Sequence, residues 1–368
     1  MTLAIYGAGV YGRVFLQGLI QSGVGVDFFI DQYSSAKEIS GLPILRMNEV
    51  DRPKEVKVLI SVALNEKENQ LNTIAENLIA EGFCELLIFE QALRAYPKIL
   101  PHFPQHKILW MSPDKEQMLD TEKLNRLENL LSDEKSKTLL KRIMAFRSSF
   151  SVHDYVSSDG QEEYFPDDVP WQMRNQPLRF VDAGAYVGDT VKSCVQACQA
   201  DAQPLEWIIS FEPDIRNIEH YRQEIEIQMT QAPQVQFMLY TSAVYSSDCI
   251  LSFSNEGNSS SAIEQQRPGE NTLSIPANAL DSVLYGARPN YLKFDVEGAE
   301  LQALQGAQKI IQTYTPQLAV CVYHKPADLW ELPLYIHSLN PNYDFYLRVH
   351  GHMGLSTVLY CIPKQGNL

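Results

Sequence analysis

The sequence has little positive charge, no long apolar run and no group of closely paired cysteines. Its 30 lysine and arginine residues stand against 45 acidic residues, giving a formal net charge of -15, which would repel nucleic-acid phosphates and anionic membranes. No apolar stretch reaches the roughly 20 residues of a membrane-spanning helix, and the first residues lack the basic segment and cleavage site of a secretory signal. We therefore expect a soluble cytoplasmic protein that binds neither nucleic acid nor membrane.

The six cysteines are scattered, which argues against both a disulfide framework and a zinc site. No two of them form a C-x-x-C pair, and several lie in apolar runs typical of core strands. Glycine and proline, at 19 and 20 residues, are near their usual frequency, so collagen-like and largely disordered chains are excluded. We predict a globular protein whose thiols are free and buried: Cys84, Cys194, Cys198, Cys249, Cys321 and Cys361.

Short apolar runs alternate with helical patterns over residues 1–95, which is typical of parallel strands joined by crossover helices. Residues 96–176 differ, because proline-rich patches flank a charged helical stretch at 114–150, and we interpret them as a helical connector. The alternation returns, more strongly, over residues 177–368. The chain is thus predicted to hold a small parallel α/β domain, a connector and a larger α/β domain. In the small domain we expect strands at 3–6, 26–30, 56–62 and 85–89 and helices at 10–22 and 68–81.

The larger domain is predicted to form a doubly wound sheet of seven strands. The last two strands follow each other without a helix, so the final strand is expected to pair antiparallel at the sheet edge. An insertion is predicted to add strands at 250–253 and 271–275 around a polar tip at 255–261. The seven strands are expected at 179–183, 207–211, 235–239, 291–294, 318–322, 345–349 and 357–361, with helices at 189–199, 214–229, 299–313 and 327–339.

The first strand of the larger domain ends in Asp182, and the chain then turns at Gly184 and Gly188 into a helix. A glycine turn at the carboxyl end of a parallel strand lets a ligand approach the backbone closely. Only two glycines match, so this is not the three-glycine dinucleotide fingerprint. The next strand ends in Glu212, where an acid is placed to accept hydrogen bonds from ribose hydroxyls. Together, these two strand ends predict a nucleoside site.

Charged residues are also dense after the strand at 291–294, where Asp295 and Glu297 precede the helix that Glu300 begins. Charges at the end of a buried strand are costly unless they have a function. The alternative is that Glu297 and Glu300 only cap the helix, since carboxylates are favoured at its N-terminus. His324 ends the following strand and therefore borders the same crevice as Asp295. An imidazole there can act as a base near neutral pH, and a purely structural histidine is the alternative.

These motifs, at residues 180–190, 211–214, 291–307 and 322–336, resemble the FkbM-type S-adenosylmethionine-dependent methyltransferases. The most specific part is the sequence DVEGAE, followed about 30 residues later by the strand end YHKP. The resemblance covers residues from about 160 to 363. It implies a seven-stranded Rossmann-like methyltransferase fold and methyl transfer to a hydroxyl oxygen, with sugars, glycans or polyketide-like small molecules as acceptors.

The resemblance also implies which residues form the site. Asp295 and Glu297 would lie near the transferred methyl group and His324 near the acceptor, so these three are the candidate catalytic residues. The candidate S-adenosylmethionine-binding residues are Asp182, Gly184, Tyr186, Gly188, Thr190, Glu212, Pro213, Ser242, Ala243 and Asp295.

An aliphatic hydroxyl is a poor nucleophile, so its proton must be removed during methyl transfer. Asp295 or His324 is the expected base, and His324 in that role would titrate near its ordinary pKa of about 6.5. A metal ion could acidify the hydroxyl instead, held by Asp295, His324, His350 and His352. Their spacing is not a recognised ligand pattern, so we predict no metal.

The small domain carries Gly7, Gly9 and Gly12 directly after a strand, with Asp31 at the end of the next strand. This context matches the Rossmann dinucleotide fingerprint, but about 95 residues cannot supply two complete mononucleotide halves. We predict a nucleotide or nucleotide-sugar at this second site, with a purely structural role as the alternative. The rival functions for the whole chain are a nicotinamide-dependent oxidoreductase or epimerase of nucleotide-sugars and a non-catalytic module of a carbohydrate pathway.

Overall fold

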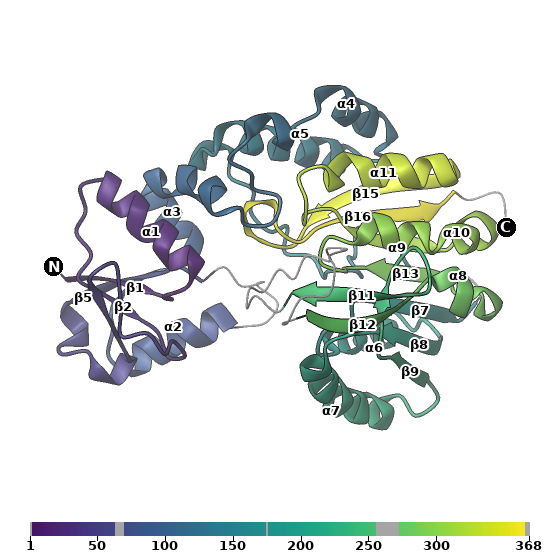
Figure 1. The fold of residues 1–368 in the computed structure, drawn as a ribbon, viewed down its shortest axis with the longest axis horizontal. Coiled ribbons are helices and arrows are strands. Elements are labelled where there is room, and N and C mark those ends of the chain that lie inside the picture. Colours follow the sequence, from purple (N-terminus) through teal and green to yellow (C-terminus); the bar gives the residue numbers. More distant parts are fainter. Residues whose placement is uncertain (1, 63–69, 174–175, 255–271, 365–368) are drawn as a thin grey trace. The chain divides into compact units, whose positions relative to one another are not determined.

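The computed structural model describes residues 2–62, 70–173, 176–254 and 272–364, which fall into two compact units (Figure 1). Unit 1 comprises Met1–Leu119, Leu140–Gly160 and Val349–Ser356. Unit 2 comprises Asp120–Leu139, Gln161–Arg348 and Thr357–Leu368. The predicted connector, residues 96–176, is therefore shared between both units. Among the described residues, none of the helices combines the length and the apolar character that crossing a membrane requires.

Unit 1 contains a six-stranded sheet in the order β3-β4-β2-β1-β5-β6. Its pairings are parallel except between β3 and β4, a short antiparallel pair that the apolar pattern did not predict. The expected strand at 85–89 ends early, because the Gln91 side chain accepts a hydrogen bond from the Ile88 backbone N–H and the chain enters a helix at Phe89. The strands are β1 (Thr2–Tyr6), β2 (Phe28–Ile30), β3 (Glu38–Ile39), β4 (Leu42–Leu45), β5 (Val56–Ile60) and β6 (Glu85–Leu87); the helices are α1 (Val10–Gln21), α2 (Gln70–Ala80) and α3 (Phe89–Ala95).

The charged helical stretch predicted at 114–150 contains two α-helices, α4 (Thr121–Leu130) and α5 (Glu134–Ser149). Asp120 caps α4 by accepting a hydrogen bond from the Lys123 backbone N–H. Between the two helices the chain is extended, and Leu131 forms a parallel bridge with Phe345. The break therefore follows from pairing with a distant strand, which helical periodicity cannot reveal.

Unit 2 contains a seven-stranded sheet in the order β15-β16-β14-β13-β7-β8-β9. The last strand runs antiparallel to β14 as expected, but the prediction that it lies at the edge is wrong, because β15 occupies the edge. The residues 358–361 are fully buried, as an inner strand requires, whereas burial alternates along the first part of β15. The strands are β7 (Leu178–Ala183), β8 (Leu205–Phe211), β9 (Gln236–Tyr240), β13 (Tyr291–Phe294), β14 (Gln317–Cys321), β15 (Tyr343–Val349) and β16 (Thr357–Pro363).

The helix predicted at 299–313 is interrupted at Gly306. A Cβ atom on this glycine would lie 2.0 Å from the carbonyl oxygen of Tyr245, so the close approach of another segment fixes the break. A small sheet in the order β10-β12-β11 follows β9, and its predicted tip, 255–261, lies outside the described residues. The remaining elements of unit 2 are α6 (Asp189–Ala200), α7 (Ile215–Gln231), β10 (Ala243–Val244), β11 (Cys249–Ser254), β12 (Thr272–Asn278), α8 (Leu280–Val283), α9 (Glu300–Gln305), α10 (Gln308–Tyr314) and α11 (Asp328–Leu339).

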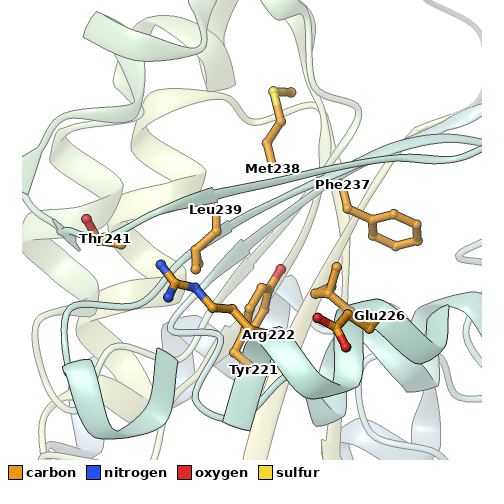
Figure 2. A pocket seen from close by; sticks show the side chains of 8 residues that line it. Tyr221, Arg222, Glu226, Phe237, Met238, Leu239 and Thr241 are labelled. Carbon is orange, nitrogen blue, oxygen red and sulfur yellow. The ribbon is translucent and has the colours of Figure 1, made fainter. Parts of the chain in front are cut away.

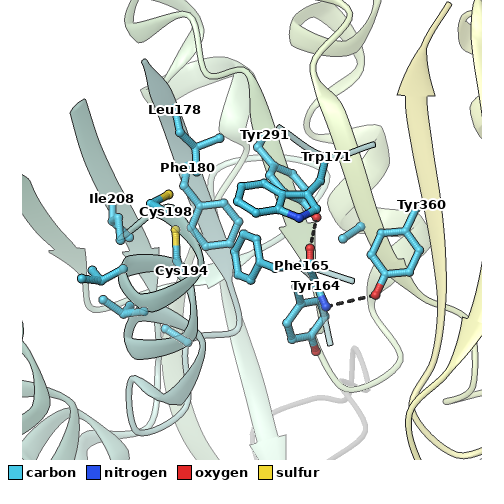
Figure 3. Close-up of a cluster of buried hydrophobic side chains, with 14 of the residues drawn as sticks. Tyr164, Phe165, Trp171, Leu178, Phe180, Cys194, Cys198, Ile208, Tyr291 and Tyr360 are labelled. Carbon is cyan, nitrogen blue, oxygen red and sulfur yellow. Dashed lines mark hydrogen bonds between the residues drawn. The ribbon is translucent and has the colours of Figure 1, made fainter. Parts of the chain in front are cut away.

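An aromatic cluster anchors the segment before β7 to the sheet of unit 2 (Figure 3). The Phe165 ring lies 5.1 Å from that of Trp171 and 5.7 Å from that of Tyr291. The Tyr164 backbone N–H donates to the hydroxyl oxygen of Tyr360 at 3.0 Å, and the Tyr291 hydroxyl donates to the Tyr164 carbonyl. These contacts fix Tyr164 against β13 and β16.

A buried guanidinium stabilises unit 2 at β15, the edge strand of its sheet. Arg348, 1% exposed, lies 2.6 Å from Asp133 and 2.9 Å from Asp168, and it donates to Ser136 at 2.9 Å. Burial alone would raise the pKa of both aspartates, but Arg348 and their other donors hold the pKa of each below its ordinary value. The network joins β15 to the start of α5.

The cysteines are free, as predicted, but not all are buried. Cys84 is exposed and Cys249 is half-buried, because each lies outside the central strands. The other four are buried in unit 2: Cys194, Cys198, Cys321 and Cys361.

Candidate functional site

A buried ion pair joins two neighbouring strands at the centre of unit 2. Asp182 on β7 lies opposite Lys293 on β13, and its Oδ1 is 2.9 Å from the Lys293 Nζ. The ammonium group also donates to the carbonyl of Gly184. Burial raises the pKa of Asp182 to about 6, although Lys293 opposes this change. Burial would lower the pKa of Lys293, but the charges of Asp182 and Asp295 raise the Lys293 pKa above its ordinary value. Sequence reasoning assigned Lys293 no role, and the structure shows that it ties the strand end to the glycine turn.

The glycine turn after β7 is held by contacts within the chain. Gly184 has a φ of +89°, and a Cβ atom there would lie 1.8 Å from the carbonyl oxygen of Asp295. At Gly188, with a φ of +90°, a Cβ atom would lie 3.3 Å from side-chain atoms of Tyr221 and Glu224. The expectation that the first glycine leaves room for a ligand is thus incomplete, because a backbone carbonyl already occupies that space.

Glu212, 6% exposed, links this turn to the end of β8 and the start of α7. Its Oε2 accepts a hydrogen bond from the Tyr186 backbone N–H at 2.9 Å, and its Oε1 accepts from the Asp214 N–H and the Asn217 side chain at 2.8 and 3.2 Å. Burial raises the pKa of Glu212, although these donors oppose the change. The carboxylate therefore organises the turn, a role that the sequence did not indicate.

The other predicted cofactor residues lie on neighbouring elements of unit 2. Thr190 is buried in the first turn of α6, Pro213 follows Glu212 directly, and Ala243 begins β10. The Ser242 hydroxyl is buried and forms no hydrogen bond with the part of the chain that the structure describes.

A cavity of about 320 Å³ lies between α7 and β9 (Figure 2). None of the predicted site residues lines it, although Thr241 in its wall precedes Ser242. The cavity is therefore distinct from the strand ends where the predicted residues gather. Its lining consists of Tyr221, Arg222, Ile225, Glu226, Phe237, Met238, Leu239 and Thr241.

Three carboxylates surround the His324 ring beyond the ends of β13 and β14. The Nε2 of His324 lies 3.5 Å from both Asp295 Oδ1 and Glu297 Oε2, and its Nδ1 lies 3.0 Å from Glu300 Oε1. The two strands are parallel neighbours, so the prediction that Asp295 and His324 converge is confirmed. The imidazole and Glu300 are buried, whereas the Glu297 side chain is 57% exposed.

The carboxylates determine the charge of the ring. Burial would lower the pKa of His324, but Glu300, Asp295 and Glu297 raise it to about 10. The ring is then protonated at neutral pH, so the expectation that it titrates near 6.5 as a free base is wrong. Burial would raise the pKa of Asp295, but Lys293 and His324 hold it below its ordinary value.

Two further residues complete this cluster. Tyr164 donates a hydrogen bond from its buried hydroxyl to Asp295 Oδ2 at 2.9 Å; the two residues lie 131 positions apart, and no motif connects them. Glu300 accepts hydrogen bonds at Oε1 from the backbone N–H groups of Val296 and Gly298, at 2.9 and 3.2 Å. Glu300 therefore holds the loop that precedes α9. It does not cap the helix in the expected way, because the N-cap residue is Ala299 and no side chain accepts a hydrogen bond there.

Metal-ligating side chains also gather here. Within the described residues, Asp295, Glu300 and His324 each offer one donor atom, and these atoms lie within 4.8 Å of one another. The group that the described residues form contains Glu300 in place of His350 and His352, which belong to unit 1. There His350 lies 3.6 Å from Asp159, and the His352 ring lies against Phe89.

In unit 1, the predicted glycine turn follows β1 and opens α1. A Cβ atom on Gly12 would lie 2.0 Å from the Gly7 carbonyl oxygen, whereas nothing lies within 4 Å of one on Gly9. Asp31 accepts hydrogen bonds from three backbone N–H groups, including that of Ala8 within the turn, each at 2.8 Å. The acid therefore binds the turn of its own chain, and nucleotide binding at this second site stays a prediction.

One family model matches part of unit 2. Residues 182–351 match the family model described as the methyltransferase FkbM domain. Among solved structures, the chain is similar to the methyltransferase FkbM from Methylobacillus flagellatus KT, with 21% sequence identity and a TM-score of 0.60; the match covers 98% of this chain and 89% of that one. At this identity the similarity shows a shared fold. No curated protein matches the sequence.

Two other solved structures match less well. The acetyltransferase domain of PglB from Neisseria gonorrhoeae FA1090 has 22% identity and a TM-score of 0.18, covering 22% of this chain and 40% of that one. The CMeT domain of the citrinin polyketide synthase has 12% identity and a TM-score of 0.27, covering 83% and 81%.

Proposed function

We propose that this chain, whose residues 182–351 match the methyltransferase FkbM domain model, transfers the methyl group of S-adenosylmethionine to a hydroxyl oxygen of a sugar, glycan or polyketide-like small molecule. The observation that carries the proposal is the contact between two parts of unit 2. The glycine turn after β7 lies against the backbone of Asp295, so close that a Cβ atom on Gly184 would meet the Asp295 carbonyl. A cofactor at the turn would therefore lie beside the cluster of acids around His324.

The residues at the turn fit the cofactor. Glu212 Oε2 accepts one hydrogen bond, and a carboxylate oxygen can accept a second from a ribose hydroxyl. The buried hydroxyl of Ser242 has no partner among the described residues, which fits a polar group of the adenosine part. Glu212, Ser242 and the glycine turn would hold the nucleoside. The bound cofactor supplies a methyl group already activated by a positively charged sulfur.

The chain must then orient the acceptor and receive its proton. The Glu297 carboxylate is the exposed member of the cluster and reaches to 3.5 Å from His324, so we assign it the proton of the acceptor hydroxyl. Asp295 is fixed by Tyr164 at 2.9 Å and would orient the hydroxyl. His324 holds both carboxylates and acts as a positioning residue. The left-handed backbone of Glu297, with a φ of +54°, is a conformation that persists where the surroundings require it.

The acidic surroundings favour an uncharged acceptor. Three carboxylates lie within 3.5 Å of the single imidazole, and the whole chain carries a net charge of -15. An anionic acceptor would be repelled from this crevice, whereas neutral hydroxyl groups can donate hydrogen bonds to carboxylates. This supports sugar-like or polyketide-like hydroxyls over phosphorylated or carboxylated compounds.

The rival oxidoreductase function has less support. It would need a dinucleotide ribose on Asp31, whose two oxygens accept hydrogen bonds in the same pattern as those of Glu212. The preference for methyl transfer therefore rests on the methyltransferase model that matches residues 182–351. For unit 1 we keep the prediction of a nucleotide or nucleotide-sugar, supported by the open space over Gly9.

Isothermal titration calorimetry with S-adenosylhomocysteine and, separately, with NAD tests the proposal. We expect S-adenosylhomocysteine to bind and isotope-labelled methyl groups to pass from S-adenosylmethionine to neutral hydroxylated compounds. Binding of NAD without S-adenosylhomocysteine would favour the oxidoreductase. Binding of S-adenosylhomocysteine together with labelling of a nitrogen or carbon atom would refute oxygen as the acceptor atom.

A further inference from the structure

The cluster around His324 holds more negative than positive charge. Asp295, Glu297 and Glu300 contact one imidazole, so the group has a formal charge of -2 even when the ring is protonated. Lys293 is paired with the buried carboxylate of Asp182 at 2.9 Å. Excess charge in a largely buried place is unfavourable unless a cation balances it.

Two oxygen atoms of the cluster have no donor. Glu300 is fully buried. Its Oε1 accepts hydrogen bonds from the backbone N–H groups of Val296 and Gly298, and its Oε2 forms no hydrogen bond with the described residues. Asp295 Oδ1 likewise accepts no hydrogen bond, although His324 lies 3.5 Å away. A buried carboxylate oxygen without a donor is a ready ligand for a metal ion.

We propose that Asp295, Glu300 and His324 bind a divalent cation. Their donor atoms lie within 4.8 Å of one another, a spread that a single ion can draw together. The mixed set of carboxylate oxygen and imidazole nitrogen suits first-row ions such as Mn²⁺, whereas Mg²⁺ and Ca²⁺ prefer oxygen alone. The imidazole nitrogen that binds the ion would carry no proton, since metal ligands must be deprotonated.

An ion with three protein ligands has coordination positions left for substrate. If the proposed function holds, the ion can therefore take part in methyl transfer. The acceptor hydroxyl would coordinate at an open position beside the exposed Glu297, and the ion would make its proton more acidic. The O–H bond breaks and the proton passes to Glu297; the oxygen forms a bond to the methyl carbon as the carbon–sulfur bond breaks, and that electron pair stays on sulfur. The cation is neither oxidised nor reduced.

Titration of the full-length protein with Mn²⁺, followed by the electron paramagnetic resonance signal of the free ion, tests the binding. The protein is first treated with a chelator and held at about pH 8, where protons compete less for the ligands. We expect one ion per chain. Glu300→Gln keeps an oxygen that can accept from Val296 and Gly298, so it should fold, and we expect it to weaken Mn²⁺ binding at least tenfold. The matched control is Glu219→Gln, a change of an exposed carboxylate on α7, which should leave binding unchanged.

If Glu300→Gln does not fold, His324→Gln replaces it, with the same expected loss. No Mn²⁺ binding, or equal binding by wild type, Glu300→Gln and His324→Gln, would overturn the metal site. Calorimetry with S-adenosylhomocysteine on the same samples separates this result from the proposed function. Binding of S-adenosylhomocysteine without Mn²⁺ would refute only the metal, while Mn²⁺ binding without S-adenosylhomocysteine would refute the methyltransferase and leave the metal site standing.

Discussion

Replacing Glu212 with glutamine should weaken S-adenosylhomocysteine binding through two effects that the structure makes explicit. The carboxylate accepts a backbone N–H on each side, from Tyr186 at Oε2 and from Asp214 at Oε1. Glutamine has one acceptor oxygen, so its amide nitrogen must face one of these N–H groups. If the amide nitrogen faces Tyr186, the turn after β7 loses its hydrogen bond to the residue that follows β8. In either orientation the carboxylate charge that the ribose would contact is lost.

The expected size follows from the bonds lost. A hydrogen bond to a charged group contributes roughly 1.5–3 kcal/mol, which corresponds to a loss of affinity of about 10-fold to 150-fold. Calorimetry measures the affinity, and circular dichroism verifies that the variant is folded. Asp214→Asn is the control, because Asp214 pairs with the exposed Arg216 and caps α7, a role that asparagine also fills. Unchanged affinity in a folded Glu212→Gln variant would show that Glu212 neither contacts the ribose nor orders the turn around it.

Four further changes test other parts of the structure. Gly184→Ala should lower the free energy of unfolding in urea by at least about 2 kcal/mol, because its Cβ atom would collide with a backbone carbonyl at positive φ. The control is Gly286→Ala, where nothing lies within 4 Å of the added Cβ atom. Equal stability of the two variants would disprove the close approach of the Asp295 carbonyl to Gly184. Gly9→Val adds its side chain to open space, so it should leave S-adenosylhomocysteine affinity unchanged while reducing calorimetric binding of a nucleotide-sugar such as UDP-glucose; loss of S-adenosylhomocysteine binding in the folded variant would contradict two separate sites. Arg348→Met should lower the free energy of unfolding by about 2 kcal/mol at pH 7, since it removes the partner of two part-exposed carboxylates. Those carboxyls have lowered pKa values in the folded state, so the difference in stability from wild type should shrink as the pH falls below about 4. A difference that does not change with pH would contradict the ion pairs. Glu297→Gln should slow single-turnover methylation by roughly 10²–10⁴-fold with unchanged cofactor affinity. A wild-type rate in this variant would show that Glu297 does not receive the proton.

The sheet of unit 2 was predictable because its strands are buried runs separated by helices. Residues 179–183 and 291–294, for example, appear as apolar runs that end in a charge, and both form strands there. The order of strands was harder. The apolar run at 358–361 looks the same in the sequence whether it lies inside the sheet or at its edge. Only its place between β14 and the partly half-buried strand β15 shows that it lies inside.

The candidate site was predictable to the extent that it lies at strand ends. Asp295 and His324 follow neighbouring parallel strands, so their convergence follows from topology. Tyr164 was missed because its contact with Asp295 depends on the aromatic packing of a segment without regular secondary structure. The charge of His324 was misjudged for a similar reason, because its pKa depends on the positions of three carboxylates rather than on its place in a motif.

The glycine at 184 shows how the two parts of the site depend on each other. Sequence reasoning attributes this glycine to the approach of a ligand, but the structure places the carbonyl of Asp295 against it and the ammonium of Lys293 on its own carbonyl. Lys293 in turn pairs with Asp182, so the turn that would hold the cofactor and the acid that would orient the acceptor share one set of contacts. A shift of either backbone must move the other, since interiors this closely packed have no space to absorb it. The distance between the methyl donor and the acceptor would therefore be fixed by the backbone itself, which is the positioning that methyl transfer requires.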